Sequence, residues 1–189
     1  YDRYNFSFRN TTNFLNNKFI LDTSANYIIQ NDKNMVSQGQ YFNPLTSLYL
    51  FPRGEDFSDV AVYERYDDLS GVNTQYWPYG DLGGVSSQNP YWIMNRMNRE
   101  NDRRRYKLAA SLQYNIIEGL NVQGRVSIDN TESKYTEKFH AGTVGNFAGP
   151  KGRYKEENRL DRQVYADVLA NFNKTFNEFN VTANLGASI

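Results

Sequence analysis

The chain has 189 residues and no cysteine, and its 21 basic and 21 acidic side chains give a formal net charge of zero. The lack of cysteine excludes a disulfide framework and a thiol nucleophile, and the neutral charge argues against nucleic acid as a partner. A mean hydropathy of -0.74 excludes a membrane protein built from helices. It does not exclude a β-barrel, because barrel strands alternate apolar and polar residues and are polar on average.

Alternation of apolar and polar side chains predicts a first β-hairpin, with strands at about residues 3–14 and 18–30. Asn16 and Asn17 provide the turn signal between them. Aromatic residues fall near both ends of this hairpin, where the interfacial girdles of a barrel lie. The apolar positions are Tyr4, Phe6, Phe8 and Phe14, then Phe19, Leu21, Ala25, Tyr27 and Ile29.

A long connection at about residues 31–102 follows, rich in Asn, Asp, Gly, Pro and aromatic residues. A connection of that length is uncommon unless it has a function. Aromatic faces stack on sugars and anchor partner proteins, although packing of these rings within the loop is the alternative. The candidates for contact with a substrate or partner are Trp77, Tyr79, Tyr91 and Trp92.

The most regular alternation lies in the middle of the chain and predicts strands at about residues 104–117 and 120–130. Glu118 and Gly119 form the turn. Each arm has about ten residues, compared with five or six in an average strand. Strands of this length suit a transmembrane barrel, whose strands cross roughly 25 Å of hydrocarbon at a tilt.

A second polar connection, at about residues 131–158, leads to a third hairpin with strands at about 159–174 and 179–189. Asn177 and Glu178 form its turn. The three hairpins thus have short turns and are joined by two long loops. This asymmetry is typical of outer-membrane barrels, with turns on the periplasmic side and loops on the extracellular side.

The predicted fold class is therefore all-β, as a segment of one antiparallel up-and-down transmembrane β-barrel domain over residues 1–189. About six strands form it, arranged in three hairpins. A soluble β-sandwich, whose apolar faces are buried on a second sheet, is the alternative. Six strands are too few to close a barrel, which needs about eight, so we expect further strands from this or other chains.

The two faces of the predicted sheet have different expected environments. The apolar face touches lipid, and its test positions are Leu112, Val126, Val168 and Val181. The polar face lines the lumen, where charged residues line the path of a solute, hold a plug by ion pairs, or simply fill the lumen. The lumen-facing candidates are Asp22, Arg125, Asp129 and Asp167.

We predict no catalytic site, metal or cofactor. The only histidine, His140, has no cysteine or second histidine with which to form a zinc site. Acidic clusters at 31–34 and 55–59 lack the spacing of a known calcium loop. The neighbours Asp67 and Asp68 are no evidence for the separated carboxylates of a glycosidase. The glycine-rich run at 80–84 lacks the Lys-Ser/Thr of a phosphate loop.

Four short motifs occur in order along the chain: Phe42-Asn43-Pro44-Leu45, Gln88-Asn89-Pro90-Tyr91-Trp92, Arg104-Arg105-Tyr106, and the hairpin IIEGLNVQGRVSIDN. In their order and spacing they resemble a segment of the SusC/RagA-type TonB-linked (TonB-dependent) transporters of the bacterial outer membrane. The resemblance implies a plugged barrel of about twenty-two strands embedded in outer-membrane lipid. It also implies import of glycan or peptide fragments with a SusD-like lipoprotein, powered by a TonB complex acting on a plug that this sequence lacks.

The leading hypothesis is thus a wall segment of an outer-membrane nutrient importer, which is not an enzyme. A secreted or surface-attached β-sandwich that binds carbohydrate is the alternative, and a glycan-active enzyme is a third possibility. Detergent dependence separates the first from the other two, because a barrel segment is insoluble without detergent or its remaining strands.

Overall fold

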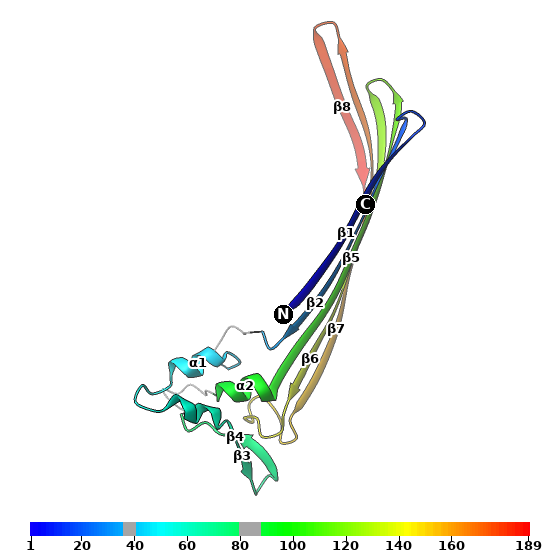
Figure 1. Ribbon diagram of the computed structural model, residues 1–189. Coiled ribbons are helices and arrows are strands. Elements are labelled where there is room, and N and C mark those ends of the chain that lie inside the picture. The colour runs from blue at the N-terminus through cyan, green and yellow to red at the C-terminus, as the bar shows by residue number, and fades with distance from the viewer. Residues whose placement is uncertain (36–40, 80–87) are drawn as a thin grey trace. The chain divides into compact units, whose positions relative to one another are not determined.

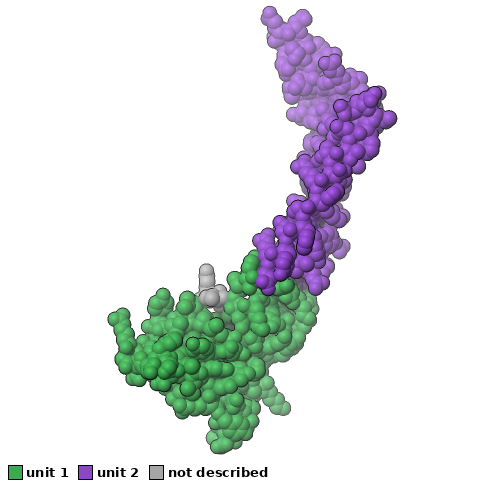
Figure 2. Space-filling model, viewed as in Figure 1, with its two compact units in different colours: residues 1, 31–102, 134–158 green, residues 2–30, 103–133, 159–189 purple. Residues whose placement is uncertain are grey.

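The computed structural model describes residues 1–35, 41–79 and 88–189. The glycine-rich run at 80–84, which the sequence excludes as a phosphate loop, lies outside the described residues. Within the described ranges, no helix is both long and apolar enough to cross a membrane. The chain forms two compact units, coloured separately in Figure 2. Unit 1 consists of residues 1, 31–102 and 134–158, and unit 2 of residues 2–30, 103–133 and 159–189.

The fold is mostly antiparallel β-sheet, as the alternation predicts. Six strands are ordered β1-β2-β5-β6-β7-β8 (Figure 1), so the strands of this sheet are arranged in the order in which the chain reaches them. The sheet is open, with β1 and β8 at its edges, and closure into a barrel stays a prediction. The strands are β1 (Asp2–Phe14), β2 (Phe19–Lys33), β5 (Met97–Ile117), β6 (Leu120–Phe139), β7 (Arg153–Phe176) and β8 (Phe179–Ser188).

The three short turns lie where the sequence predicts them. Asn16, Asn17 and Asn177 adopt the left-handed backbone conformation that asparagine tolerates, with φ of 52°, 64° and 53°. Gly119 has a φ of 85°, and a Cβ there would collide with the carbonyl oxygen of Asn173. Only glycine fits this position, so the turn between β5 and β6 depends on it.

Three strands run further than the alternation predicts. β5 begins at Met97, β6 continues to Phe139 and β7 begins at Arg153, so the second loop contains only residues 140–152. In these extensions charged side chains occupy both faces, which removes the apolar-polar alternation while the backbone still pairs. The shorter predicted limits followed from the loss of that pattern.

The long connection between β2 and β5 is folded, because it carries helices and a second, two-stranded sheet. Both α-helices of the described residues begin at an Asn-Pro pair. The Asn43 side chain accepts a hydrogen bond from Leu45 N at 3.0 Å, and that of Asn89 accepts one from Tyr91 N at 2.9 Å. The elements are α1 (Pro44–Tyr49), the 3-10 helix η1 (Phe57–Ala61), β3 (Glu64–Asp67), β4 (Val72–Gln75) and α2 (Pro90–Arg96).

Burial differs in kind between the two units. In unit 1 the described residues build a hydrophobic core from Trp92, Ile93, Met97, Phe139 and Ala148. In unit 2, all of whose residues are described, the only buried side chains are polar, namely Asn130 and Asp167. Unit 2 is therefore a sheet without an apolar interior of its own.

Candidate functional site

The candidate site is the polar face of the sheet in unit 2, where carboxylates pair with guanidinium groups across neighbouring strands. The best buried of them is Asp167 on β7, whose side chain is only 3% exposed. Arg125 on β6 donates to it through Nε at 2.9 Å and through Nη2, and the Tyr165 hydroxyl donates to the same carboxylate at 2.6 Å. A carboxylate with three donors is fully committed, whereas Arg125 remains 45% exposed.

Two further pairs repeat this arrangement. Arg9 Nε on β1 donates to Asp22 on β2 at 3.1 Å, and the Thr11 hydroxyl donates to the same oxygen at 2.8 Å. Arg105 on β5 holds Asp129 on β6 through a bond of 2.8 Å from Nε and a second bond to the other oxygen. All four predicted lumen-facing residues thus lie in cross-strand ion pairs, which the sequence pattern alone did not specify.

Amide side chains extend the hydrogen bonding over the same sheet. Bonds between side chains join β1 to β2, β6 to β7, and β7 to β8. The donor and acceptor pairs are Asn26 to Asn5 and Ser7, Asn171 to Asn121, and Asn180 to Asn173. The polar face is therefore a connected surface of polar groups, which is what a water-filled or plugged lumen requires.

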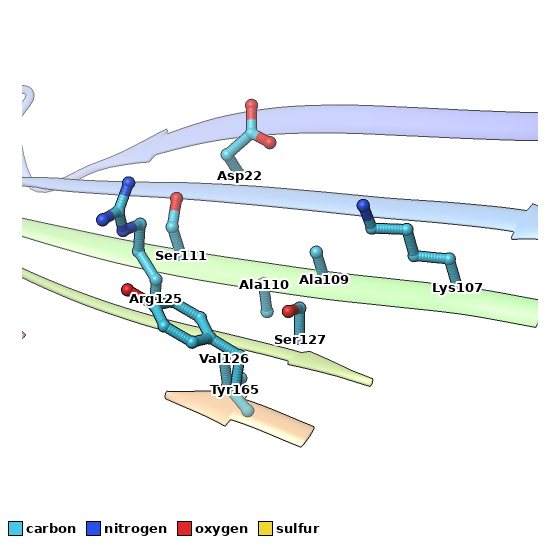
Figure 3. A pocket seen from close by; sticks show the side chains of 9 residues that line it. All are labelled: Asp22, Lys107, Ala109, Ala110, Ser111, Arg125, Val126, Ser127 and Tyr165. Carbon is cyan, nitrogen blue, oxygen red and sulfur yellow. The ribbon is translucent and has the colours of Figure 1, made fainter. Parts of the chain in front are cut away.

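A hollow of about 500 Å³ opens on this face, across β2, β5, β6 and β7 (Figure 3). Figure 3 shows Lys107, Ser111 and Arg125 rising from one side of the strands, with Ala110 and Val126 directed to the other side. The small residues on its floor leave room between the charged groups. Its lining includes Asp22, Lys107, Ala109, Ser111, Arg125, Ser127 and Tyr165.

The opposite face of unit 2 is apolar and exposed. Each of the four test positions has between 44% and 54% of its surface exposed, and larger side chains such as Phe6 and Phe8 are more than 60% exposed. Phe19 and Tyr114 stack across β2 and β5 with ring centroids 4.6 Å apart. The test positions Leu112, Val126, Val168 and Val181 are therefore not sealed inside a compact body.

The height of this apolar band fits a bilayer. On β5 the apolar positions run at every second residue from Tyr106 to Ile116. That length is ~34 Å along a strand, or ~26 Å at a tilt of about 40°. The hydrophobic band of an outer-membrane barrel is about 25 Å tall. Beyond Tyr106 the next residue of this alternation is Arg104, so charge begins where the band ends.

Two of the predicted contact residues are core residues of unit 1. Trp92 is 1% exposed, and its indole Nε1 donates to Thr143 Oγ1 at 3.2 Å. Trp77 is 9% exposed and packs against Phe51 and Tyr79. Packing within unit 1 accounts for both rings, and contact of either tryptophan with a sugar or a partner stays a prediction.

The two predicted tyrosines keep some exposed surface. Tyr79 is half-buried and meets Phe51 edge-on, with ring centroids 5.2 Å apart. Tyr91 is 37% exposed and stacks on Tyr63 at 6.3 Å. Each already has an aromatic neighbour, so packing within unit 1 accounts for both residues, and contact with a ligand stays a prediction.

Asn89, which the sequence shows only as part of a motif, forms three side-chain hydrogen bonds in unit 1. Its amide Nδ2 donates to the carbonyls of Val60 at 2.9 Å and Tyr76 at 3.1 Å, while its Oδ1 caps α2. Its neighbour Gln88 donates to the Tyr41 carbonyl. The available signal was the Asn-Pro pair before an apolar run, which marks the start of a helix.

Charged residues also connect the strands in unit 1. Glu100 on β5 accepts a hydrogen bond from Lys138 on β6 at 3.0 Å and lies 3.6 Å from Lys33. The bond from Lys138 is the largest cause of the lowered pKa of Glu100. Burial, and then the hydrogen bond to Glu137, raise the pKa of Tyr135 to about 12, so this phenol stays neutral at physiological pH.

Acidic residues in the loops act as local caps. Asp56 accepts a hydrogen bond from Ser58 N at 2.9 Å at the start of η1, and Asp67 accepts one from Ser70 N at 3.2 Å in the turn after β3. Among the described residues, no group of three His, Cys, Asp or Glu could hold a metal ion. These carboxylates are accounted for by the turns they stabilise.

Comparison with known proteins provides no further identification. No known protein family matches the chain, and no curated protein matches it.

Proposed function

We propose that this chain forms part of the wall of an outer-membrane β-barrel that imports glycans or peptides. The observation that carries the proposal is the inverted burial in unit 2, where the buried side chains are polar and the apolar side chains are exposed. A sheet of this kind is stable when lipid covers its apolar face and water or a plug covers its polar face.

The amount of exposed apolar surface in unit 2 also favours a lipid environment. Burying a Val, Leu or Phe side chain contributes roughly 1.5–3 kcal/mol. Ten such side chains, each 39–78% exposed, would forfeit on the order of 10 kcal/mol if water covered them, which is comparable to the whole stability of an ordinary domain. Such residues in unit 2 include Phe6, Phe8, Leu108, Leu112, Ile116, Val126, Val164, Val168, Val181 and Leu185.

The sheet edges support closure by further strands. β1 is 13 residues long, and β8 is 10 residues long and contains neither proline nor charge. Soluble proteins protect exposed edges with proline, lysine or short strands, because unpaired backbone groups attract other strands. Edges without these features favour pairing with additional barrel strands.

The transport role rests on the resemblance to SusC/RagA-type transporters and on the polar face. We propose that unit 1 forms the extracellular mouth, that a SusD-like lipoprotein covers it, and that a TonB complex acts through a plug. The ion-paired face would line the route of the solute. The chain itself would contribute binding surfaces and no catalytic step.

A carbohydrate-binding β-sandwich is the second candidate. It is favoured only by the aromatic cluster of Phe51, Trp77 and Tyr79 in unit 1. A sandwich needs a second sheet over the apolar face, and among the described residues the only other sheet is the two-stranded β3–β4 pair within unit 1. The barrel wall therefore accounts for more of the structure.

The proposal can be tested by binding to lipid vesicles. Replacing Leu112 with arginine places a charge in the apolar band, at a cost of about 2–4 kcal/mol if the residue faces the middle of a bilayer. Gln113→Arg places the same charge on the neighbouring position of the polar face. We expect the wild type and Gln113→Arg to float with vesicles in a density gradient, and Leu112→Arg to float in much smaller yield.

Two results would contradict the proposal. One is a wild-type protein that is monomeric in detergent-free buffer and does not bind vesicles, which would favour the β-sandwich. The other is equal flotation of the two arginine variants, which would mean that lipid does not distinguish the faces.

A further inference from the structure

The hollow on the polar face of unit 2 has a surplus positive charge. Asp22, the carboxylate on its lining, is held by Arg9, and the lining residue Arg125 is paired with Asp167. Lys107 also lies on the hollow and forms no ion pair among the described residues. Asp129, a carboxylate on which the charge of Lys107 acts, is already held by Arg105. Because each carboxylate is neutralised by an arginine, the ammonium group of Lys107 has no compensating negative charge.

A second donor faces the same space. Arg125 uses the Nε and Nη2 edge of its guanidinium to hold Asp167, which leaves Nη1 on the opposite edge. Because the carboxylate fixes the guanidinium plane, this donor is positioned in advance. Figure 3 shows this guanidinium and the Lys107 ammonium at opposite ends of the hollow, so together they are complementary to a ligand with two carboxylates.

The remaining lining suits a sugar. Ser111 and Ser127 supply hydroxyl groups that both donate and accept, and Tyr165 supplies a partly exposed ring. Ala109 adds no bulk to the floor. A volume of about 500 Å³ lies within the ~300–1,000 Å³ typical of small-ligand sites.

We propose that this hollow binds an acidic oligosaccharide, with one carboxylate of an oligouronate on Lys107, another on Arg125, and its hydroxyls on Ser111 and Ser127. The inference rests on the proposed function, because a lumen-facing hollow would be a binding site along the route of the imported solute. It narrows the solute class from glycans or peptides to glycans that carry carboxylates.

The test measures binding, without transport, by the full-length protein in detergent micelles. Calorimetry compares trigalacturonate with uncharged trigalactose and with triglutamate. We expect trigalacturonate to bind about tenfold or more tightly than either of the others, and to weaken as salt increases. Lys107→Met should lower the affinity for trigalacturonate about tenfold and leave trigalactose unchanged.

Lys174→Met is the matched control, since it removes a lysine of the same sheet that does not line the hollow. Equal affinity for the charged and uncharged sugars, or equal losses in the two lysine variants, would overturn the proposal. Equal affinity for triglutamate would overturn the sugar assignment. The flotation experiment does not involve these ligands. A negative binding result would therefore overturn only the sugar-site proposal, and the barrel-wall proposal would still be judged by flotation.

Discussion

At the scale of single residues, the polar face depends on how completely each carboxylate is enclosed. Asp167 is 3% exposed and has donors from Arg125 and Tyr165, whereas Asp22 is 27% exposed and its partner Arg9 lies largely in solvent. Removing an enclosed carboxylate, whose place water cannot take, costs more than removing one that water can replace.

We therefore expect Asp167→Asn to reduce the free energy of unfolding more than Asp22→Asn does. The neutral amide keeps the size of the side chain but loses its charge, and one of its two terminal groups becomes a donor that faces Arg125. Urea titration of the protein in detergent or vesicles measures both losses. A larger loss of unfolding free energy for Asp22→Asn would show that the burial of the carboxylate does not determine how much each ion pair contributes to stability.

Gly119 provides a second test at this scale. Gly119→Ala should destabilise the β5–β6 hairpin by roughly 1–3 kcal/mol, because its φ is positive and the new Cβ would collide with the Asn173 carbonyl. Gly124→Ala in β6 is the control, since a Cβ there meets nothing within 4 Å. Equal stability of the two variants in urea titration would contradict this account of the turn.

At the scale of elements, unit 1 is organised by its Asn-Pro helix starts. Asn89→Ala removes a cap and two bonds to buried carbonyls, so we expect a loss of at least about 2 kcal/mol. Asn43→Ala removes one exposed cap bond and should cost about 1 kcal/mol. Both tryptophans lie in unit 1, so tryptophan fluorescence during urea unfolding reports on this unit. If Asn43→Ala lowered the free energy of unfolding as much as Asn89→Ala, the two additional hydrogen bonds of Asn89 would not contribute to stability.

The strand extensions in unit 1 make a prediction about pH. The pKa of Glu100 is lowered in the folded state, chiefly by Lys138. Its contribution to stability is therefore complete above the pKa of the unfolded carboxyl, near 4.5, and is lost as the pH falls through the lower folded value. Glu100→Gln should be less stable than wild type at pH 7, and the difference should shrink on acidification below pH of about 4. A difference that stays constant with pH would exclude this ion pair as its cause.

The sequence could predict the elements only where side-chain pattern reports burial. Alternation located β1 and β8 closely, because one face of β8 is apolar throughout and one face of β1 carries Tyr4, Phe6, Phe8 and Phe14. It could not reveal that β6 continues to Phe139, since backbone pairing there is accompanied by charges on both faces. Nor could it show that Phe19 meets Tyr114, because β2 and β5 become neighbours only after a long connection has folded.

At the scale of the whole chain, the sequence could assign the residues of the candidate site to a face of the sheet. It could not identify their ion-pair partners. Alternation assigned Asp22, Arg125, Asp129 and Asp167 to the polar face, and each forms an ion pair with a residue of a neighbouring strand. The cross-strand register that pairs Arg125 with Asp167 is a property of the assembled sheet. In unit 1, residue type alone suggested binding roles for Trp77 and Trp92, whereas a tertiary core buries both.

The central claim is that lipid covers the apolar face of unit 2. Because the chain has no cysteine, any introduced cysteine is unique and can carry an environment-sensitive dye. The measurement compares dyes at Leu112, Val126 and Val168 with dyes at the polar positions Gln113 and Asn171, in vesicles that contain nitroxide-labelled lipids. We predict blue-shifted emission and strong quenching by lipid only at the three apolar positions. Equal emission and equal quenching at all five positions would contradict the barrel-wall account.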